Sequence, residues 1–89
     1  MSWTIEYDIL VQKKIRKLDP QTRARIRSFL HERVAHLSDP RLTGAALQGS
    51  ELGSYWRYRV GDYRIICDIQ DRKLIVLVVD LGHRGDVYR

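Results

Sequence analysis

Residues 55–69, YWRYRVGDYRIICDI, constrain the fold of this chain more strongly than any other segment. Two runs rich in aromatic and β-branched residues flank the dipeptide Gly61-Asp62, and a glycine supplies the positive φ that a type II′ turn requires. The pattern predicts a β-hairpin with a two-residue loop. Val60 then pairs with Tyr63, and this pair fixes the register of both strands.

The predicted register separates the hairpin side chains into two faces, because successive residues of a strand point to opposite sides of the sheet. One face is apolar and carries Trp56, Tyr58, Val60, Tyr63, Ile65, Cys67 and Ile69. The other face carries Arg57, Arg59 and Arg64. Like charges directly opposite one another destabilise a sheet. The arginines therefore indicate an anion in the working complex; the alternative is a solvated outer face on which they serve solubility.

The first part of the chain predicts a strand followed by two helices. Residues 3–7 alternate as a strand does, and Asp8 is expected to cap a helix that ends near Leu18. The apolar stripe expected on this helix consists of Leu10, Val11, Ile15 and Leu18. Asp19 and Pro20 suit the N-cap and first position of a second helix, which ends near Leu37. We expect an antiparallel helical hairpin that covers a sheet.

The last part predicts one more strand beside the hairpin. Asp71-Arg72 indicates a second tight turn, and the apolar residues 74–81 predict a central strand buried on both faces. With a two-residue loop, Arg64 pairs with Val79, and His83 and Arg84 emerge just beyond that end of the sheet. The predicted order is β-α-α-β-β-β, an α+β fold with a mostly antiparallel sheet packed against the helical hairpin. Residues 1–89 are expected to form a single domain.

The composition favours a compact domain with a polyanionic partner. Of 89 residues, 44% are hydrophobic and 30% are charged, and the net charge is +5. A small basic domain without a long apolar helix favours nucleic acid over a membrane surface. The N-terminal sequence MSWTIEYD has neither the basic segment nor the long apolar run of a signal peptide, so we expect a cytoplasmic protein with no membrane partner.

The sequence does not indicate metal or cofactor chemistry. His31, His36 and His83 lack the spacing of metal ligands, and no cysteine or carboxylate cluster has it either. There is no glycine loop of the kind that cradles phosphate. Cys67 falls on the apolar face of the hairpin, where a buried and inert thiol is expected. We therefore expect no metal and no small-molecule cofactor.

The remaining candidates for chemistry are basic and aromatic residues: Arg57, Arg59, Arg64, His83, Arg84 and Tyr88. Arginine forks match phosphate oxygens and stay charged, which suits the stabilisation of a phosphorane-like transition state. RNA carries its own nucleophile in the 2′-OH, so its cleavage also needs in-line positioning and a proton donor for the leaving 5′-oxygen. Arginine transfers protons poorly near neutral pH, whereas His83 titrates in the right range. The alternative is that His83 is a tail residue hydrogen-bonded to backbone.

The chain resembles the RelE/ParE toxin superfamily, and more closely its RelE branch of ribosome-dependent mRNA interferases. The resemblance rests on the helical hairpin, on L-x-G at residues 47–49, on WRYRVGDYR at 56–64 and on GHRGDVY at 82–88. It implies the toxin of a type II toxin–antitoxin system, an endoribonuclease that enters the ribosomal A site and cuts mRNA through the 2′-OH. It also implies a cognate antitoxin encoded beside the toxin, whose C-terminal part wraps it.

The resemblance further implies roles for the candidate residues. Phosphate binding and transition-state stabilisation are implied for Arg57, Arg59 and Arg64. Arg84 is implied to assist the leaving group, and Tyr88 to stack on a base or orient it. His83 stands where the best-known member has a lysine, and a histidine there takes over part of the proton transfer.

Two other interpretations use the same fold. One is a ParE-like toxin without enzymatic activity that binds and poisons DNA gyrase. The complete set of arginines together with His83 and Tyr88 favours the nuclease, because the gyrase-directed branch is generally without it. The other is an inactive relative that binds only its antitoxin.

Overall fold

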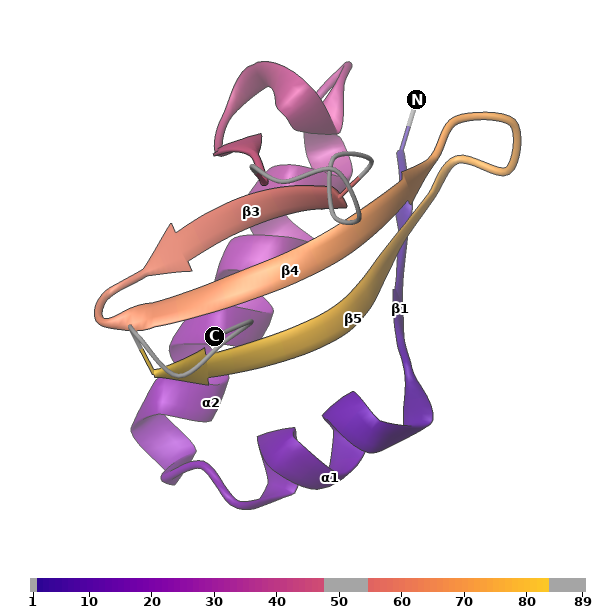
Figure 1. Cartoon of the computed structure of the whole chain (residues 1–89). Helices are drawn as coiled ribbons and strands as arrows, with labels where there is room; N and C mark the ends of the chain where they lie inside the picture. Colours follow the sequence, from indigo (N-terminus) through magenta and orange to yellow (C-terminus); the bar gives the residue numbers. More distant parts are fainter. Residues whose placement is uncertain (1, 48–54, 84–89) are drawn as a thin grey trace.

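A mixed β-sheet with helices packed against one of its faces forms the described part of the chain (Figure 1). The computed structural model describes residues 2–47 and 55–83. The main elements are β1 (Thr4–Tyr7), α1 (Ile9–Arg16), α2 (Pro20–Ser28), β2 (Ala45–Ala46), β3 (Tyr55–Val60), β4 (Tyr63–Gln70) and β5 (Ile75–His83). The strand order is β1-β5-β4-β3-β2, with β1 parallel to β5 and the other pairs antiparallel. The predicted α+β class is confirmed, with the two-residue β2 as an addition.

Asp8 and Asp19 begin the two helices, as the sequence predicts. Each carboxylate accepts a hydrogen bond of 3.0 Å from a backbone N–H in the first turn of its helix, and Pro20 occupies the first position of α2. Helical structure continues beyond α2 through a π-type turn (Phe29–Arg33) and a 3₁₀ turn (Val34–His36). The second helical segment therefore ends close to its predicted end, although its hydrogen-bonding pattern changes at Phe29.

The predicted apolar stripe of α1 is wrong at Leu10. Val11 and Ile15 are buried, whereas the side chain of Leu10 is 64% exposed and that of Ile9 is 71% exposed. α1 is short and lies beside the edge of the sheet rather than across it (Figure 1). Only residues spaced four apart on one side, Val11 and Ile15, reach the core, and Leu10 lies about 100° around the helix from Val11.

The hydrophobic core lies between α2 and one face of the sheet. In Figure 1, α2 passes behind β3, β4 and β5. Side chains buried between these layers include Ile26, Leu30, Tyr58, Ile65, Val76 and Val78. Tyr58 packs edge-on against Phe29, with ring centroids 5.6 Å apart. Its hydroxyl donates to the carbonyl oxygen of Pro40 at 2.6 Å, so the one polar atom of this buried side chain is satisfied.

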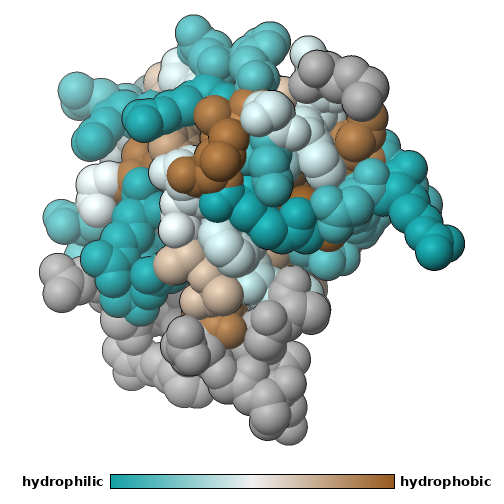
Figure 2. Space-filling view, turned by 90° about the horizontal axis from the view of Figure 1, so that it is seen from above, coloured by the Kyte–Doolittle hydropathy of each residue, from teal (hydrophilic) through white to brown (hydrophobic). Residues whose placement is uncertain are grey.

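Burial is less complete on the other face of the sheet. In β5, Val76 and Val78 are fully buried towards the core, but Leu77 and Val79 are only half-buried. The prediction of a strand buried on both faces is therefore correct for one face only, the face that α2 covers. Seen from above, the surface is largely hydrophilic with small apolar patches (Figure 2). Within the described ranges, no helix is both long and apolar enough to cross a membrane.

The register predicted for the β3–β4 hairpin is confirmed. Val60 pairs with Tyr63, and Arg59 with Arg64. Gly61 has the expected positive φ, at 59°. Cys67 is fully buried on the core side, and burial, with a smaller contribution from Asp68, raises the pKa of its thiol. The thiol is therefore protonated at neutral pH, in agreement with the expected inert cysteine.

The predicted pairing of β4 with β5 is wrong by three residues. The turn spans residues 71–74 rather than two residues, because Gln70 pairs with Ile75. A bulge then adds one more residue to β5, since Ile66 pairs with Asp80 and the next residue of β4 pairs with Val78. Arg64 consequently lies opposite Gly82 instead of Val79. His83 is not beyond the end of the sheet but forms its last pair there, with Tyr63.

Gly44 allows the segment before β3 to approach that strand closely. Its φ is 84°, and a Cβ atom at this position would lie 2.5 Å from the carbonyl oxygen of Arg57 and 2.7 Å from the indole nitrogen of Trp56. The same indole donates to the carbonyl oxygen of Thr43 at 2.7 Å. This approach places β2 against β3, where Ala45 pairs with Arg57.

We predict that Gly44→Ala destabilises the protein more than Gly61→Ala. Both substitutions force an alanine into the left-handed region, at a cost of about 1–2 kcal/mol. Only the first also meets backbone, because the nearest atom to a Cβ at Gly61 is the end of the Arg25 side chain, at 3.3 Å. Urea denaturation of the two variants checks this. Equal losses of unfolding free energy would show that the segment at Gly44 shifts freely away from β3.

Candidate functional site

Three arginines lie together on the sheet face that points away from α2, the face turned to the viewer in Figure 1. Arg57 and Arg59 come from β3, and Arg64 comes from β4 directly opposite Arg59. Arg57 and Arg64 are half-buried, whereas Arg59 is exposed. The predicted grouping of these three side chains is therefore present, and we call it the arginine face.

The arginines of this face repel one another. The pKa of Arg57 is lowered, first by burial and then by the positive charges of Arg59 and Arg64. The ion pairs among the described residues involve Lys14 and Arg41 instead, so none of them neutralises this face.

Arg64 also has a buried hydrogen-bond donor that is left unsatisfied by the described residues. Its Nε is inaccessible to solvent and has no hydrogen-bond partner among the described residues. Leaving such a donor unsatisfied costs about 1–3 kcal/mol. Mutual repulsion and an unsatisfied donor are both relieved when an anion binds, and phosphate oxygens suit guanidinium groups well.

The arginine face continues into a groove at the edge of β3. The groove has a volume of about 350 Å³ and is lined by Phe29 and Arg33 from the π-type turn, by residues 43–45, and by Arg57, Tyr58 and Arg59. The guanidinium carbon of Arg33 lies 5.9 Å from the centroid of the Phe29 ring. Arg33 thus brings a further positive charge to the groove. No local sequence pattern signals the approach of Arg33 to β3, because that approach depends on tertiary packing.

His83 is on the opposite side of the sheet from the arginine face. The ring centroids of His83 and Tyr63 are 5.5 Å apart in an edge-to-face contact, and Tyr63 packs against the core. The two side chains line a hollow of about 290 Å³ together with Lys14 of α1, with Lys17 and Leu18 just after that helix, and with Leu81 and Gly82 of β5. The expected clustering of His83 with the arginines is therefore corrected, and the cause is the bulge in β5. Arg84 and Tyr88 lie outside the described residues.

Metal ligands do not gather in the described part of the chain. No three side chains of histidine, cysteine, aspartate or glutamate come together there. His31 instead pairs with an aromatic residue: its Nε2 and the hydroxyl oxygen of Tyr7 are 2.8 Å apart, and the two rings are stacked.

Comparisons with known proteins point to one group of toxins. The profile of a family described as the ParE toxin of the type II toxin–antitoxin system parDE matches residues 5–88. Toxin RelG of Mycobacterium tuberculosis is 27% identical over 89 residues, which are 100% of this chain and 99% of that protein.

Solved structures of RelE toxins share the fold. The toxin–antitoxin complex RelBE2 from Mycobacterium tuberculosis contains a chain that matches with a TM-score of 0.84 and 24% identity, over 97% of this chain and 95% of that one. The isolated E. coli RelE toxin matches with a TM-score of 0.73 and 19% identity, over 98% of this chain and 89% of that one. The arrangement of two helices on a mixed sheet is therefore that of RelE toxins.

We predict that Arg59→Gln stabilises the free protein at low ionic strength. The substitution removes the repulsion between directly opposed guanidinium groups, which we expect to be worth some tenths of a kcal/mol. The gain should fade at high salt, where exposed charges are screened. Arg72→Gln is the matched control, because it removes an exposed charge in the turn at 71–74. Denaturation midpoints at low and high salt check this, and a loss of stability in Arg59→Gln at both would contradict it.

Proposed function

Because this chain belongs to the ParE toxin family of type II toxin–antitoxin systems, we propose that it is a ribosome-dependent endoribonuclease. In this proposal it cleaves mRNA in the ribosomal A site and so inhibits translation. The observation that carries the proposal is the arginine face, where Arg57, Arg59 and Arg64 converge without a carboxylate partner among the described residues.

The proposed reaction uses the 2′-OH of the RNA as nucleophile. Its oxygen attacks the adjacent phosphorus, the bond to the 5′-oxygen breaks, and a 2′,3′-cyclic phosphate and a 5′-hydroxyl result. Negative charge accumulates on the non-bridging oxygens as the phosphorane-like transition state forms. Guanidinium groups held in place by a sheet stabilise this charge without having to reorganise. The reaction as proposed uses no metal and no cofactor.

Proton transfer in this proposal falls to residues other than the arginines of the sheet. Arg84 is proposed to assist the leaving 5′-oxygen, and Tyr88 to stack on a base or orient it. His83 is the third candidate, because histidine is the side chain that most often acts as general acid or base near neutral pH. Its position on the other side of the sheet requires the RNA to pass around the end of β5 if the imidazole takes part.

A cognate antitoxin is the proposed protein partner. Support comes from the family and from the net charge of +5, which an acidic wrapping chain would neutralise. The exposed side chains of Ile9 and Leu10 on α1 add an apolar surface suited to a protein contact.

A second candidate function is a toxin that acts on DNA gyrase without catalysis. The observation that favours it is the matching profile, whose description is that of ParE toxins. The separation of His83 from the arginine face also fits it, because a binding protein has no need of a proton-transfer group beside its arginines.

We predict that Arg64→Ala abolishes most RNA cleavage without unfolding the protein. Removing a preorganised donor of this kind typically lowers the rate about a hundred- to a thousandfold. Arg57→Lys and Arg59→Lys keep the positive charge and should retain much of the activity. Primer extension on a reporter mRNA after brief expression, with and without ribosomes, measures cleavage, and thermal melting checks the fold.

Two outcomes would contradict this proposal. One is an unchanged rate of cleavage in Arg64→Ala, which would show that the arginine face does not carry the reaction. The other is that neither the parent nor the variant cuts RNA although both remain toxic, and this result would favour the gyrase-directed function.

We predict that His83→Gln and Tyr88→Phe separate the candidates for proton transfer. Activity survives in Tyr88→Phe if the ring only stacks on a base, and it drops if the hydroxyl moves a proton. Because His83 lies on the other side of the sheet from the arginines, we expect His83→Gln to retain most of the activity. Single-turnover cleavage rates across pH measure both. A strong loss in His83→Gln, with loss of the pH dependence, would place general acid or base work on the imidazole.

A further inference from the structure

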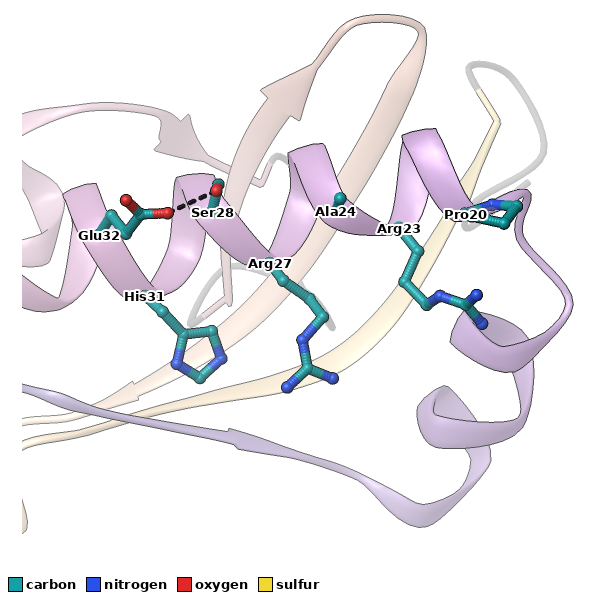
Figure 3. Close-up of a pocket in the computed structure, with 7 residues that line it drawn as sticks. All are labelled: Pro20, Arg23, Ala24, Arg27, Ser28, His31 and Glu32. Carbon is teal, nitrogen blue, oxygen red and sulfur yellow. Dashed lines mark hydrogen bonds between the residues drawn. The ribbon is translucent and has the colours of Figure 1, made fainter.

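A second basic groove lies between the two helical segments, on the other side of the molecule from the arginine face. It has a volume of about 450 Å³ and is lined by Tyr7, Gln12, Ile15, Arg16, Arg23 and Arg27. A neighbouring hollow of about 550 Å³ along α2 shares Arg23 and Arg27 and extends to His31. Figure 3 shows Arg23, Arg27 and His31 projecting from the same side of their helix, towards β1 and α1.

The positive charges of this groove have no ion-pair partner among residues 2–47 and 55–83. None of the ion pairs among the described residues involves Arg16, Arg23 or Arg27. Glu32 also lines the hollow along α2, and its carboxylate accepts a hydrogen bond from the hydroxyl of Ser28 (Figure 3). Three guanidinium groups from two helical segments therefore converge around one open space.

Tyr7 and His31 form a hydrogen-bonded and stacked pair next to these arginines. The hydroxyl oxygen of Tyr7 and Nε2 of His31 are 2.8 Å apart, and the ring centroids are 5.9 Å apart with 27° between the planes. Burial, assisted by the charge of Arg27, lowers the pKa of His31. Burial likewise raises the pKa of Tyr7, against the opposing effect of Arg27. Both groups are therefore neutral at pH 7 while the groove is empty of anions.

We propose that this groove binds a phosphate group, held by Arg16, Arg23 and Arg27 beside the Tyr7–His31 pair. Guanidinium forks match the oxygens of a phosphate and stay charged at every working pH. A phosphate monoester or inorganic phosphate brings up to two negative charges to three uncompensated positive ones. Tyr7 is the aromatic residue among the described residues that line the groove, and its ring is already stacked on His31, so the groove recognises phosphate rather than a nucleobase. The proposal does not depend on the nuclease activity, because no residue of the arginine face takes part.

The charged groups around His31 make it a reporter of the bound anion. Tyr7 faces it from β1, and Arg27 and Glu32 lie near it on its own helical segment. In the absence of an anion, Arg27 and burial oppose protonation of the imidazole. A phosphate held at Arg27 offsets that positive charge and favours the imidazolium, so the pKa of His31 should rise on binding.

The proposal can be tested by titrating inorganic phosphate into the full-length protein. NMR spectra of the His31 ring then report the pKa of its imidazole. Sodium chloride of equal ionic strength is the blank, and the ring of His36 is the internal reference. We expect the pKa of His31 to rise with phosphate and not with chloride. The double variant Arg23→Gln/Arg27→Gln should bind phosphate about tenfold more weakly for each arginine removed. Arg25→Gln/Arg72→Gln, which removes the same charge outside the groove, should bind as the parent does.

Two further arms identify the source of the phosphate. A short single-stranded RNA should displace inorganic phosphate if the groove binds an RNA backbone. The affinity for this RNA should then depend less steeply on salt concentration in Arg23→Gln/Arg27→Gln, and not in the control double variant. If a nucleoside monophosphate displaces inorganic phosphate and RNA does not, the ligand is a free phosphate compound. The proposal is overturned if phosphate and chloride act alike, if the two double variants behave alike, or if a glutamate-rich peptide of equal charge moves His31 as phosphate does.

Discussion

The antiparallel pairing of β3 with β4 is the constraint on which the rest of the structure depends. Its two-residue loop turns Tyr58 and Ile65 towards α2 and turns Arg59 and Arg64 away from it. One register therefore determines both which side chains enter the core and which form the arginine face. A slip of one residue would move each set of side chains to the opposite face of the sheet. The hydrogen bond from the Tyr58 hydroxyl to the carbonyl of Pro40 ties this register to the chain that follows the helices.

The elements of this fold that can be predicted from the sequence are those set by residues close to one another in the chain. Gly61-Asp62 sets the hairpin and Asp8 and Asp19 set the helix starts, each through atoms a few residues away. The bulge in β5 has no such signal. Before it, Val76 and Val78 face the core, and after it Leu81 does, so the alternation is reversed by one added residue. The arginines depend on the β3–β4 register alone, so their predicted face is correct, whereas His83 follows the bulge and lies on the opposite face.

Grooves are harder to predict than faces, because they form between elements that are distant in the sequence. Arg33 and Gly44 line one groove at the edge of β3 although ten residues separate them. Arg16 of α1 and Arg27 of α2 line another, between two helices that are joined by a short connection. Both arginine-rich regions carry positive charge that no ion pair within the described ranges compensates. Such uncompensated charge lowers the stability of the free protein and is retained where it serves binding.

The parallel pair of β1 and β5 joins the two ends of the described chain. Thr4 lies opposite Ile75 and Tyr7 opposite Val78, so nearly all other residues lie within the loop that this pair closes. Contacts between such distant residues form late, since the entropy of closing the loop must be offset first. β5 also flanks β4, so the arginine hairpin acquires its second neighbour only when the last strand is in place. A chain in which β5 has not yet paired with β1 and β4 therefore lacks the strand that joins the arginine hairpin to β1.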